Sequence, residues 1–217
     1  FTDPMADGPA VQAAGQRALA NGATLNTGTP TVSGTAEANS SVTVLVDGVS
    51  YCTTTASALG AFSCAGSTAL SEGAHAITAR AADAVGNTSV SSSTVNVTID
   101  TLAPASPTLS TPASGANLAT LMPSFSGTAE AGATVRVFVD GSMTPSCTAV
   151  ASGLGAWSCS ATLTEGVHTV RVQAVDTAGN SSLPTASSPF TLDVTAPALP
   201  VITTPTANAA VGSTTPT

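Results

Sequence analysis

The 217-residue chain has four arginines, no lysine and a net charge of −8, and only 7% of its residues are charged. A chain so poor in cations has no basic stripe to neutralise phosphates, which excludes nucleic acids as partners. The chain also has no run of 18 or more apolar residues, so no membrane insertion is predicted. Aromatic residues make up 3% of the chain, and Ser, Thr, Ala, Gly and Val are abundant, which is typical of a turn-rich, all-β protein.

The chain repeats itself at an interval of 93 residues. Ser-Gly-Thr-Ala-Glu occurs at 33–37 and again at 126–130, and ten of the twelve acidic residues form pairs with this spacing. The pairs are Glu37 and Glu130, Asp47 and Asp140, Glu72 and Glu165, Asp83 and Asp176, and Asp100 and Asp193. A fixed period indicates an array of packing modules rather than a single catalytic site. We therefore predict one repeat over residues 20–104 and a second over residues 105–197.

Both ends of the chain are predicted to lie outside these two repeats. Residues 1–19 are interpreted as a cloning remnant, Phe1 to Met5, followed by an N-terminal linker, so the native N-terminus and any signal peptide are expected to be missing. Residues 198–217 are interpreted as the truncated start of a third repeat, because Pro216 continues a proline series with the same interval.

Alternating side chains predict the strands of each repeat. Val42, Val44 and Val46 share one face and precede Asp-Gly at 47–48, and the second repeat has the same pattern over residues 135–141. Alternation indicates half-buried strands, and Asp-Gly is typical of a tight hairpin turn. Roughly seven short strands per repeat fit an immunoglobulin-like sandwich. The predicted fold class is all-β, with tandem immunoglobulin-like β-sandwich repeats arranged end to end.

Each repeat contains one cysteine pair with the same internal spacing, Cys52 with Cys64 and Cys147 with Cys159. Four cysteines permit three connectivities. If the repeats lie end to end, equivalent cysteines are too distant for the Cα separation of about 4.4–6.8 Å that a disulfide permits. Disulfide pairing within each repeat is therefore predicted. A zinc site is disfavoured, because the cysteines lack the clustered spacing of zinc ligands. Persistent disulfides imply an oxidising compartment, which predicts an extracellular or cell-surface location.

His75 and His168 recur at equivalent positions and share the inward parity of the strand that follows them. We interpret them as structural histidines and expect no enzyme, because no nucleophile or acid recurs with them in a catalytic motif. Trp157 occupies the position of Phe62 and is expected in the core near the disulfide. Sugar-binding platforms need exposed rings, and Tyr51 alone remains as a candidate, so a lectin function is disfavoured.

Six motifs follow one another in the same order in both repeats. They are Ser-Gly-Thr-Ala-Glu, a Val-rich strand ending in Val-Asp-Gly, Gly-Ala-Phe/Trp-Ser, Glu-Gly-x-His, Asp-x-x-Gly-Asn and Asp-x-x-Ala-Pro. This order resembles the bacterial Ig-like repeats of large extracellular adhesins and biofilm-associated surface proteins, over about residues 20–217. The resemblance implies a long stalk that holds a distal binding domain away from the cell, with calcium at some junctions. The cysteine pair departs from the commonest form of the repeat.

Carboxylates at the repeat ends are the candidate metal ligands. In such a sandwich, Glu130, Asp176 and Asn180 should lie at the end of repeat 2 where the linker arrives with Asp100. With backbone carbonyls and waters, these donors approach the six to eight oxygen ligands of calcium. The equivalent set in repeat 1 is Glu37, Asp83 and Asn87. The alternative is that Asp-x-x-Gly-Asn forms a turn whose Asp caps its own backbone, and Glu72 and Glu165 are also interpreted as turn residues.

These observations and the resemblance together predict a non-catalytic, extracellular spacer of a bacterial surface adhesin, stiffened by disulfides and junction calcium. Its partners are the neighbouring repeats, and a host or cell-surface ligand would be bound through another domain. One rival hypothesis is a glycan- or peptide-binding Ig-like module, which would use exposed rings or a sheet edge. The other is an accessory region of a secreted enzyme.

Overall fold

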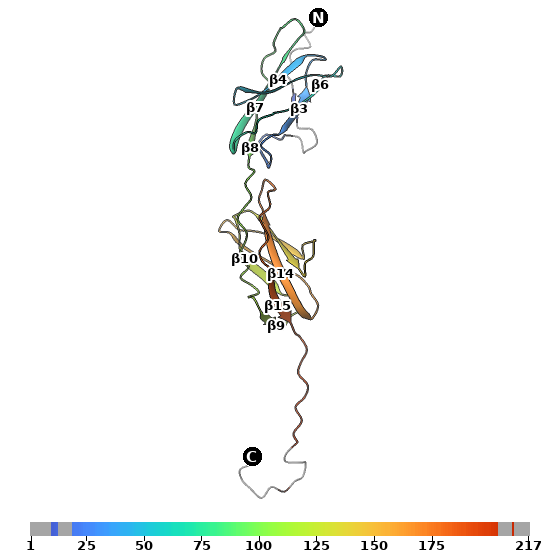
Figure 1. Ribbon diagram of the computed structural model, residues 1–217, viewed down its shortest axis with the longest axis vertical. Coiled ribbons are helices and arrows are strands. Elements are labelled where there is room, and N and C mark those ends of the chain that lie inside the picture. The colour runs from blue at the N-terminus through green and yellow to red at the C-terminus, as the bar shows by residue number, and fades with distance from the viewer. Residues whose placement is uncertain (1–9, 13–18, 204–209, 211–217) are drawn as a thin grey trace.

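The computed structural model describes residues 10–12, 19–203 and 210, and it contains two β-sandwiches in tandem. Figure 1 shows the two sandwiches one after the other along the longest axis of the molecule, joined by one short segment. The described residues form strands, turns and irregular segments without a helix, so none of them belongs to a helix that could cross a membrane. The predicted all-β fold with sandwiches arranged end to end is confirmed.

The first sandwich packs a three-stranded sheet against a five-stranded sheet. The three-stranded sheet has the order β1-β3-β6, formed by Ala10–Gln12, Thr31–Thr35 and Ala61–Ala65. The five-stranded sheet has the order β2-β8-β7-β4-β5. Its strands are β2 (Ala23–Leu25), β4 (Ser41–Val46), β5 (Val49–Thr55), β7 (Gly73–Ala82) and β8 (Val95–Ile99). The pairing is antiparallel throughout, apart from the parallel pair β2 and β8.

The first repeat begins before its predicted boundary at residue 20. Strand β1 lies inside the stretch predicted as a linker and pairs with β3, and Leu19 is buried in the core of the first sandwich. The rest of that prediction rests on residues 1–9 and 13–18, which are outside the described residues. Of the predicted third repeat, residues 198–203 have no regular secondary structure, and most of the remainder is also outside the described residues.

The second sandwich repeats the architecture of the first. Its five-stranded sheet has the order β12-β11-β14-β15-β9, and β10 pairs with β13 in the other sheet. The strands are β9 (Ala116–Leu118), β10 (Ser124–Thr128), β11 (Thr134–Val139), β12 (Cys147–Val150), β13 (Ala156–Ser160), β14 (Gly166–Val175) and β15 (Ser188–Leu192). The incoming chain takes the place of β1, because Thr108 and Ser110 donate backbone hydrogen bonds to Thr128 and Ser126 at 2.7 and 2.8 Å.

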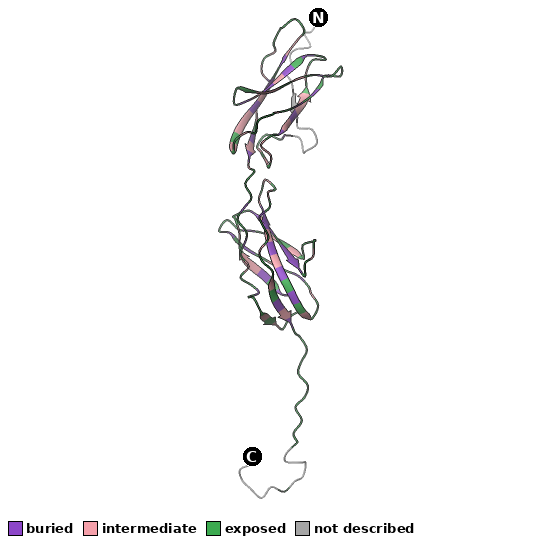
Figure 2. Cartoon of the chain, in the orientation of Figure 1, coloured by how far each residue is buried: buried purple, intermediate pink, exposed green. Residues whose placement is uncertain are grey.

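The residues predicted to face inward form the two cores. Val42, Val44 and Ile77 are fully buried in the first sandwich, and Figure 2 shows buried positions alternating with exposed ones along the strands. In the second sandwich Phe125 and Phe190 meet edge to face at 5.9 Å between ring centroids, a geometry that aromatic pairs prefer. Phe62 and Trp157 are each 4% exposed, which confirms their predicted place in the core.

One hairpin differs in length between the repeats. Asp47 and Gly48 alone connect β4 to β5, and their positive φ angles of 52° and 80° fit the two-residue turn. In repeat 2 the corresponding connection continues to residue 146, because β12 begins at Cys147. This insertion explains why the first cysteines of the two pairs, residues 52 and 147, are 95 positions apart rather than 93.

Candidate functional site at the repeat ends

The C-terminal end of the first sandwich contains a histidine held between two oxygen acceptors. Nδ1 of His75 lies 2.6 Å from Oδ2 of Asp47, and Nε2 lies 2.9 Å from the carbonyl oxygen of Ser71. The other oxygen of Asp47 accepts a hydrogen bond from the backbone N–H of Ala76 at 2.8 Å. The turn interpretation of Asp47 is confirmed by its φ angle of 52°, but the contact between the two side chains was not predicted.

The second sandwich reproduces this arrangement. Nδ1 of His168 lies 2.7 Å from Oδ2 of Asp140, and Nε2 lies 2.9 Å from the carbonyl oxygen of Thr164. The imidazole is also near the ring of Phe190, at 5.5 Å between centroids. A signal for the pair was present in the sequence, because an Asp of the Val-Asp-Gly motif precedes the His by 28 residues in both repeats.

A histidine between two acceptors is stabilised as the imidazolium. Carboxylate and carbonyl oxygens only accept hydrogen bonds, so both contacts are hydrogen bonds only when both ring nitrogens carry a proton. The bond to Ser71, followed by the bond to Asp47, raises the pKa of His75 above its ordinary 6.5. The bond to Asp140 likewise raises the pKa of His168. Both ring nitrogens are engaged in each repeat.

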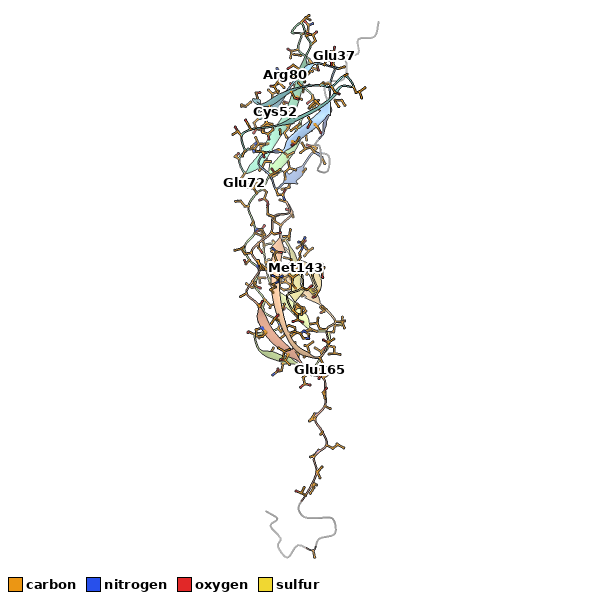
Figure 3. All side chains as sticks on the ribbon, turned by 45° about the vertical axis from the view of Figure 1, so that its right-hand side comes forward. Glu37, Cys52, Glu72, Arg80, Met143 and Glu165 are labelled. Carbon is orange, nitrogen blue, oxygen red and sulfur yellow. A yellow bond between two sulfur atoms is a disulfide. The ribbon has the colours of Figure 1, made fainter. Side chains whose placement is uncertain are left out.

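Glu72 and Glu165 hold the segment that leaves each sandwich. The Glu72 carboxylate accepts hydrogen bonds from the backbone N–H of Thr101, at 3.0 Å, and from its hydroxyl. The Glu165 carboxylate accepts bonds from the N–H and hydroxyl of Thr195, at 3.2 and 2.8 Å. Figure 3 places Glu72 at the end of the first sandwich that faces the second, and Glu165 at the far end of the second sandwich. We call the two Glu–Thr arrangements the linker clamps.

The turn interpretation of these glutamates was incomplete. The backbone bends at both glutamates, and Gly73 and Gly166 follow them with φ angles of 113° and 134° where β7 and β14 begin. The side chains, however, reach residues 29 and 30 positions further along the chain. Their function therefore depends on where β8 and β15 end, which a local pattern does not report.

The Asp-x-x-Gly-Asn loop of repeat 2 stabilises itself. Oδ1 of Asp176 accepts hydrogen bonds from the backbone N–H groups of Gly179 and Asn180 at 2.7 and 2.8 Å, and Oδ2 accepts one from the Asn180 side chain at 2.9 Å. Burial alone would raise the pKa of Asp176, but the bonds from Asn180 lower it. This geometry matches the alternative in which the Asp caps its own backbone.

The same loop also contacts the incoming linker. The Asn180 side chain donates a second hydrogen bond, of 2.7 Å, to the backbone carbonyl of Asp100. A Cβ added to Gly179 would lie 3.5 Å from the side-chain nitrogen of Asn26, so the loop also approaches repeat 1 directly. Beyond it, the Ser106 hydroxyl donates to the carbonyl of Leu183 at 2.8 Å. The linker is therefore bound to both sandwiches.

The predicted calcium ligands are only partly brought together. Asn180 reaches both Asp176 and Asp100, but the Asp100 carboxylate accepts a bond from the backbone N–H of Leu102 at 3.3 Å. Glu130 is exposed after β10. In the part of the chain that the structure describes, no three His, Cys, Asp or Glu side chains gather in a group suited to a metal ion. Calcium at this junction stays a prediction.

The second candidate set has the same loop geometry. Asp83 accepts bonds from the backbone N–H and the side chain of Asn87 at 2.8 and 2.7 Å, and the side-chain bond is the main cause of its lowered pKa. Glu37 is exposed, and its carbonyl accepts a bond from the Ser40 hydroxyl at 2.7 Å. The described residues provide no linker partner for Asn87 of the kind that Asn180 has.

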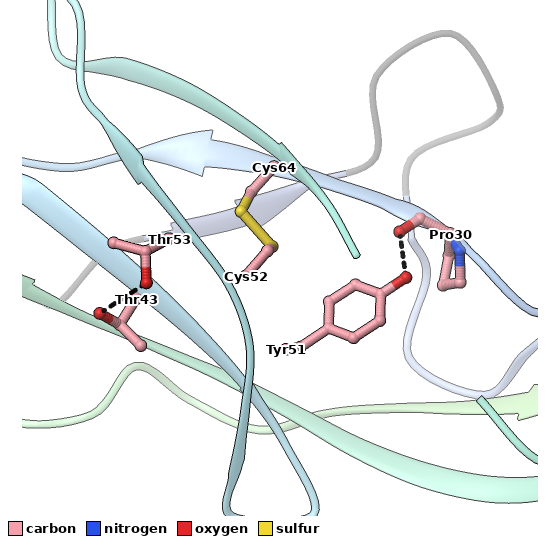
Figure 4. Close-up of a disulfide and its surroundings, with 6 residues drawn as sticks. All are labelled: Pro30, Thr43, Tyr51, Cys52, Thr53 and Cys64. Atoms are coloured by element: carbon pink, nitrogen blue, oxygen red, sulfur yellow. Dashed lines mark hydrogen bonds between the residues drawn. A yellow bond between two sulfur atoms is a disulfide. The ribbon is translucent and has the colours of Figure 1, made fainter. Parts of the chain in front are cut away.

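The disulfides join the two sheets of each sandwich along one edge. Cys52 on β5 pairs with Cys64 on β6, at 6.0 Å between Cα atoms, and Cys147 pairs with Cys159 at 6.1 Å. Both predicted pairings are confirmed. Figure 4 shows the Cys52–Cys64 bond. Because β5 and β6 are edge strands of different sheets in the described part of the chain, the bond closes an edge of the sandwich. The two disulfides fit an oxidising compartment.

Tyr51 does not present the exposed ring expected for sugar binding. Its hydroxyl donates a hydrogen bond to the Pro30 carbonyl at 3.0 Å, also visible in Figure 4, and its ring covers Gly66. The side chain packs against the first core as a partly buried residue. The feature that most favoured a glycan-binding module is therefore used in packing.

Comparisons with known proteins agree with this architecture. The fibronectin(III)-like modules of Clostridium thermocellum CbhA match 84% of this chain and 94% of their own, with a TM-score of 0.58 and 18% identity. A marsupial T cell receptor matches 89% of this chain and 75% of its own, with a TM-score of 0.55 and 7% identity. At these identities the likeness shows the fold alone. The BSP domain of a biofilm associated protein shares 18% identity over 88% of this chain and 30% of its own, with a TM-score of 0.30.

The family is shown by a sequence match to both sandwiches. A family model described as bacterial Ig-like domain matches residues 12–101 and residues 114–194. The gap between the two matches contains most of the linker, and each match ends close to a linker clamp. The chain belongs to the bacterial Ig-like domain family.

Proposed function

We propose that the chain is part of an extracellular stalk of a bacterial surface adhesin, in which each sandwich is a rigid, non-catalytic spacer. The observation that supports this most is the linker, which forms hydrogen bonds with both sandwiches. Glu72 of the first sandwich holds Thr101, and Asn180 of the second holds the carbonyl of Asp100. A linker tied to both neighbours resists bending, so each repeat adds length in a defined direction.

Burial of the linker prolines supports the same proposal. Pro104 and Pro107 are both buried, and proline restricts the backbone to extended conformations that act as semi-rigid spacers. Family membership and the two disulfides favour a location at the cell surface or outside the cell. The partners in this proposal are the neighbouring repeats, and a host or cell-surface ligand would be bound by another domain.

Calcium would add to the restraint provided by these hydrogen bonds. Bound by Asp100, Glu130, Asp176 and Asn180, it would connect the same linker to the same loop. Its contribution is separable from that of Asn180, because the hydrogen bond from the Asn180 side chain to the Asp100 carbonyl requires no metal.

The test is an Asn180→Ala variant with Asn87→Ala as its matched control. Each substitution removes one side-chain bond to the loop aspartate, but only Asn180→Ala also removes a bond to the linker. In the parent, ¹⁵N relaxation should show both sandwiches tumbling as one elongated body. Asn180→Ala should shorten the rotational correlation time of each sandwich and broaden the distance distribution from small-angle scattering. Asn87→Ala should change neither, and independent tumbling of the two sandwiches in the parent would contradict the spacer function.

A further inference from the structure

In each repeat the Asp–His pair and the linker clamp meet at one turn. His75 holds the carbonyl of Ser71, and the next residue is the clamp glutamate, Glu72. His168 holds the carbonyl of Thr164, directly before Glu165. The Glu-Gly-x-His motif therefore connects the histidine to the linker: the histidine bonds to the residue before the glutamate, and the glutamate bonds to the linker threonine.

We propose that each repeat holds its outgoing linker through a doubly protonated histidine, and that loss of one ring proton loosens the linker clamp. The imidazolium fixes the turn, and the turn aims the glutamate at the threonine of the linker. This proposal rests on the proposed spacer function, because it assigns a control of stiffness to the joints between spacers.

Deprotonation must break one of the two contacts of the ring. A neutral imidazole has one N–H donor, and its other nitrogen presents a lone pair. The remaining proton stays on Nδ1 of His75, which faces Asp47, since a hydrogen bond to a charged acceptor is stronger than one to a carbonyl. Nε2 of His75 then faces the Ser71 carbonyl without a proton, so the two atoms repel each other. The turn between Ser71 and Gly73 loses its main anchor to the hairpin.

Among the residues that the structure describes, the charged group that faces each histidine is Asp47 or Asp140. The strands paired with β7, namely β4 and β8, contain no Asp, Glu, Lys, Arg or His, and the opposite strands β3 and β6 contain none either. Arg80 lies on β7 itself, five positions from His75, and donates to Ser91. In repeat 2, Arg136 on β11 is exposed, while Arg171 on β14 points to the outer face over Phe138. The nearby titratable groups are Glu72 in the first repeat, and Glu165 with Asp193 in the second, where Asp193 also accepts a bond from the N–H of Thr195 at 3.1 Å.

The direction of the pH effect follows from the shifted pKa values. The folded-state pKa of each histidine is raised above 6.5, so the imidazolium contacts are complete below pH 6.5 and are lost as pH rises through the folded value. The pKa of Asp47 is lowered from 3.8, mainly by the bonds from Ala76 and His75, so its charge is lost only as pH falls below that value. The clamp is therefore closed between these limits and opens on the alkaline side.

The test is amide hydrogen exchange at Thr101 and Thr195, measured alongside the NMR titration of both histidine rings. A hydrogen bond contributes about 0.5–1.5 kcal/mol net, so protection at each threonine should fall by roughly 2- to 10-fold as its own histidine deprotonates. The intrinsic base-catalysed rate is divided out, and the buried amide of Val44 reports any change in global stability of the first repeat. Protection at Thr101 that stays constant through the His75 titration would overturn the proposal.

Variants in one repeat leave the other as an internal control. In His75→Gln, protection of Thr101 should be low and independent of pH, while Thr195 keeps the parent behaviour. Asp47→Asn retains a residue that accepts positive φ but removes the charge that stabilises the imidazolium. The titration of the His75 ring and the loss of protection at Thr101 should therefore both move to lower pH. A pH response of Thr101 that persists in His75→Gln would contradict the proposal. Failure of the spacer function is a separate result, because it appears as independent tumbling even at about pH 5.5, where these histidines are charged.

Discussion

At the scale of single residues, the two repeats fill one corner of the sandwich in different ways. Tyr51 and Gly66 occupy it in the first repeat, and a Cβ at Gly66 would lie 2.2 Å from the Tyr51 ring. The hairpin insertion adds two positions to the second repeat. When these are counted, the residues equivalent to Tyr51 and Gly66 are Ser146 and Ala161. A large side chain thus accompanies glycine, and a small one accompanies alanine, because the packed volume must be filled without overlap.

Gly66→Ala is therefore expected to destabilise the first repeat by about 1–3 kcal/mol, the usual cost of overpacking a core. The double substitution Tyr51→Ser and Gly66→Ala copies the second repeat and should recover part of this loss. Urea unfolding curves for the three proteins provide the measurement. Ala161→Gly in repeat 2 is the control, since no tyrosine lies over that position. Equal unfolding midpoints for Gly66→Ala and the parent would refute the packing account.

At the scale of elements, the disulfides connect edge strands rather than crossing the centre of the core. Strands β5 and β6 follow one another in the chain but belong to opposite sheets, and the Cys52–Cys64 bond keeps these sheets together at an edge that no other described strand covers. An open edge exposes backbone groups that can pair with other chains. The bond therefore limits the opening of the sandwich at a vulnerable position.

Replacing Cys52 and Cys64 with alanine is expected to lower the free energy of unfolding of the first repeat by about 3 kcal/mol, the loop-closure contribution of a bridge this short. The second repeat should retain its parent stability, and the double replacement of Cys147 and Cys159 should give the reverse pattern. Urea unfolding followed by NMR signals from each sandwich separates the two repeats. An unchanged midpoint for the first repeat would show that the bond contributes nothing to stability.

At the scale of the whole molecule, the direction of the rod depends on one short linker. Its residues donate hydrogen bonds to Glu72 and accept one from Asn180, and these bonds hold it without a metal ion. Calcium would act in addition, by neutralising carboxylates that lie at the same junction. The two contributions differ in what removes them, because chelation affects only the metal.

If calcium binds here, a concentration of about 100 times its Kd should stabilise the second repeat by roughly 2.7 kcal/mol. The experiment is a melting scan with small-angle scattering, in calcium and in EDTA, for the parent and for Asp100→Asn combined with Asp176→Asn. Asp83→Asn is the matched control for the loss of loop hydrogen bonds without a linker. Should the parent melt at the same temperature in both buffers, with the same maximum dimension, the carboxylates serve as turn residues only.

The sequence by itself determined the repeat, the strands, the cysteine pairing and the inward side chains. These properties are local or periodic, since burial on one face of a strand imposes a period of two and a shared module imposes a shared spacing. Val42, Val44 and Phe62 could be assigned to the core for this reason, without knowledge of which strands pair.

Only the tertiary structure decided what the polar residues contact. Asp47 meets His75 across 28 residues, Glu72 meets Thr101 across 29, and Asn180 meets Asp100 across 80. Each contact depends on the register of paired strands and on where the neighbouring sandwich lies, and a shift of one residue would turn these side chains to the other face. The recurrence of Asp, His and Glu at fixed intervals showed that they have a role, but only the paired strands show which groups they bind.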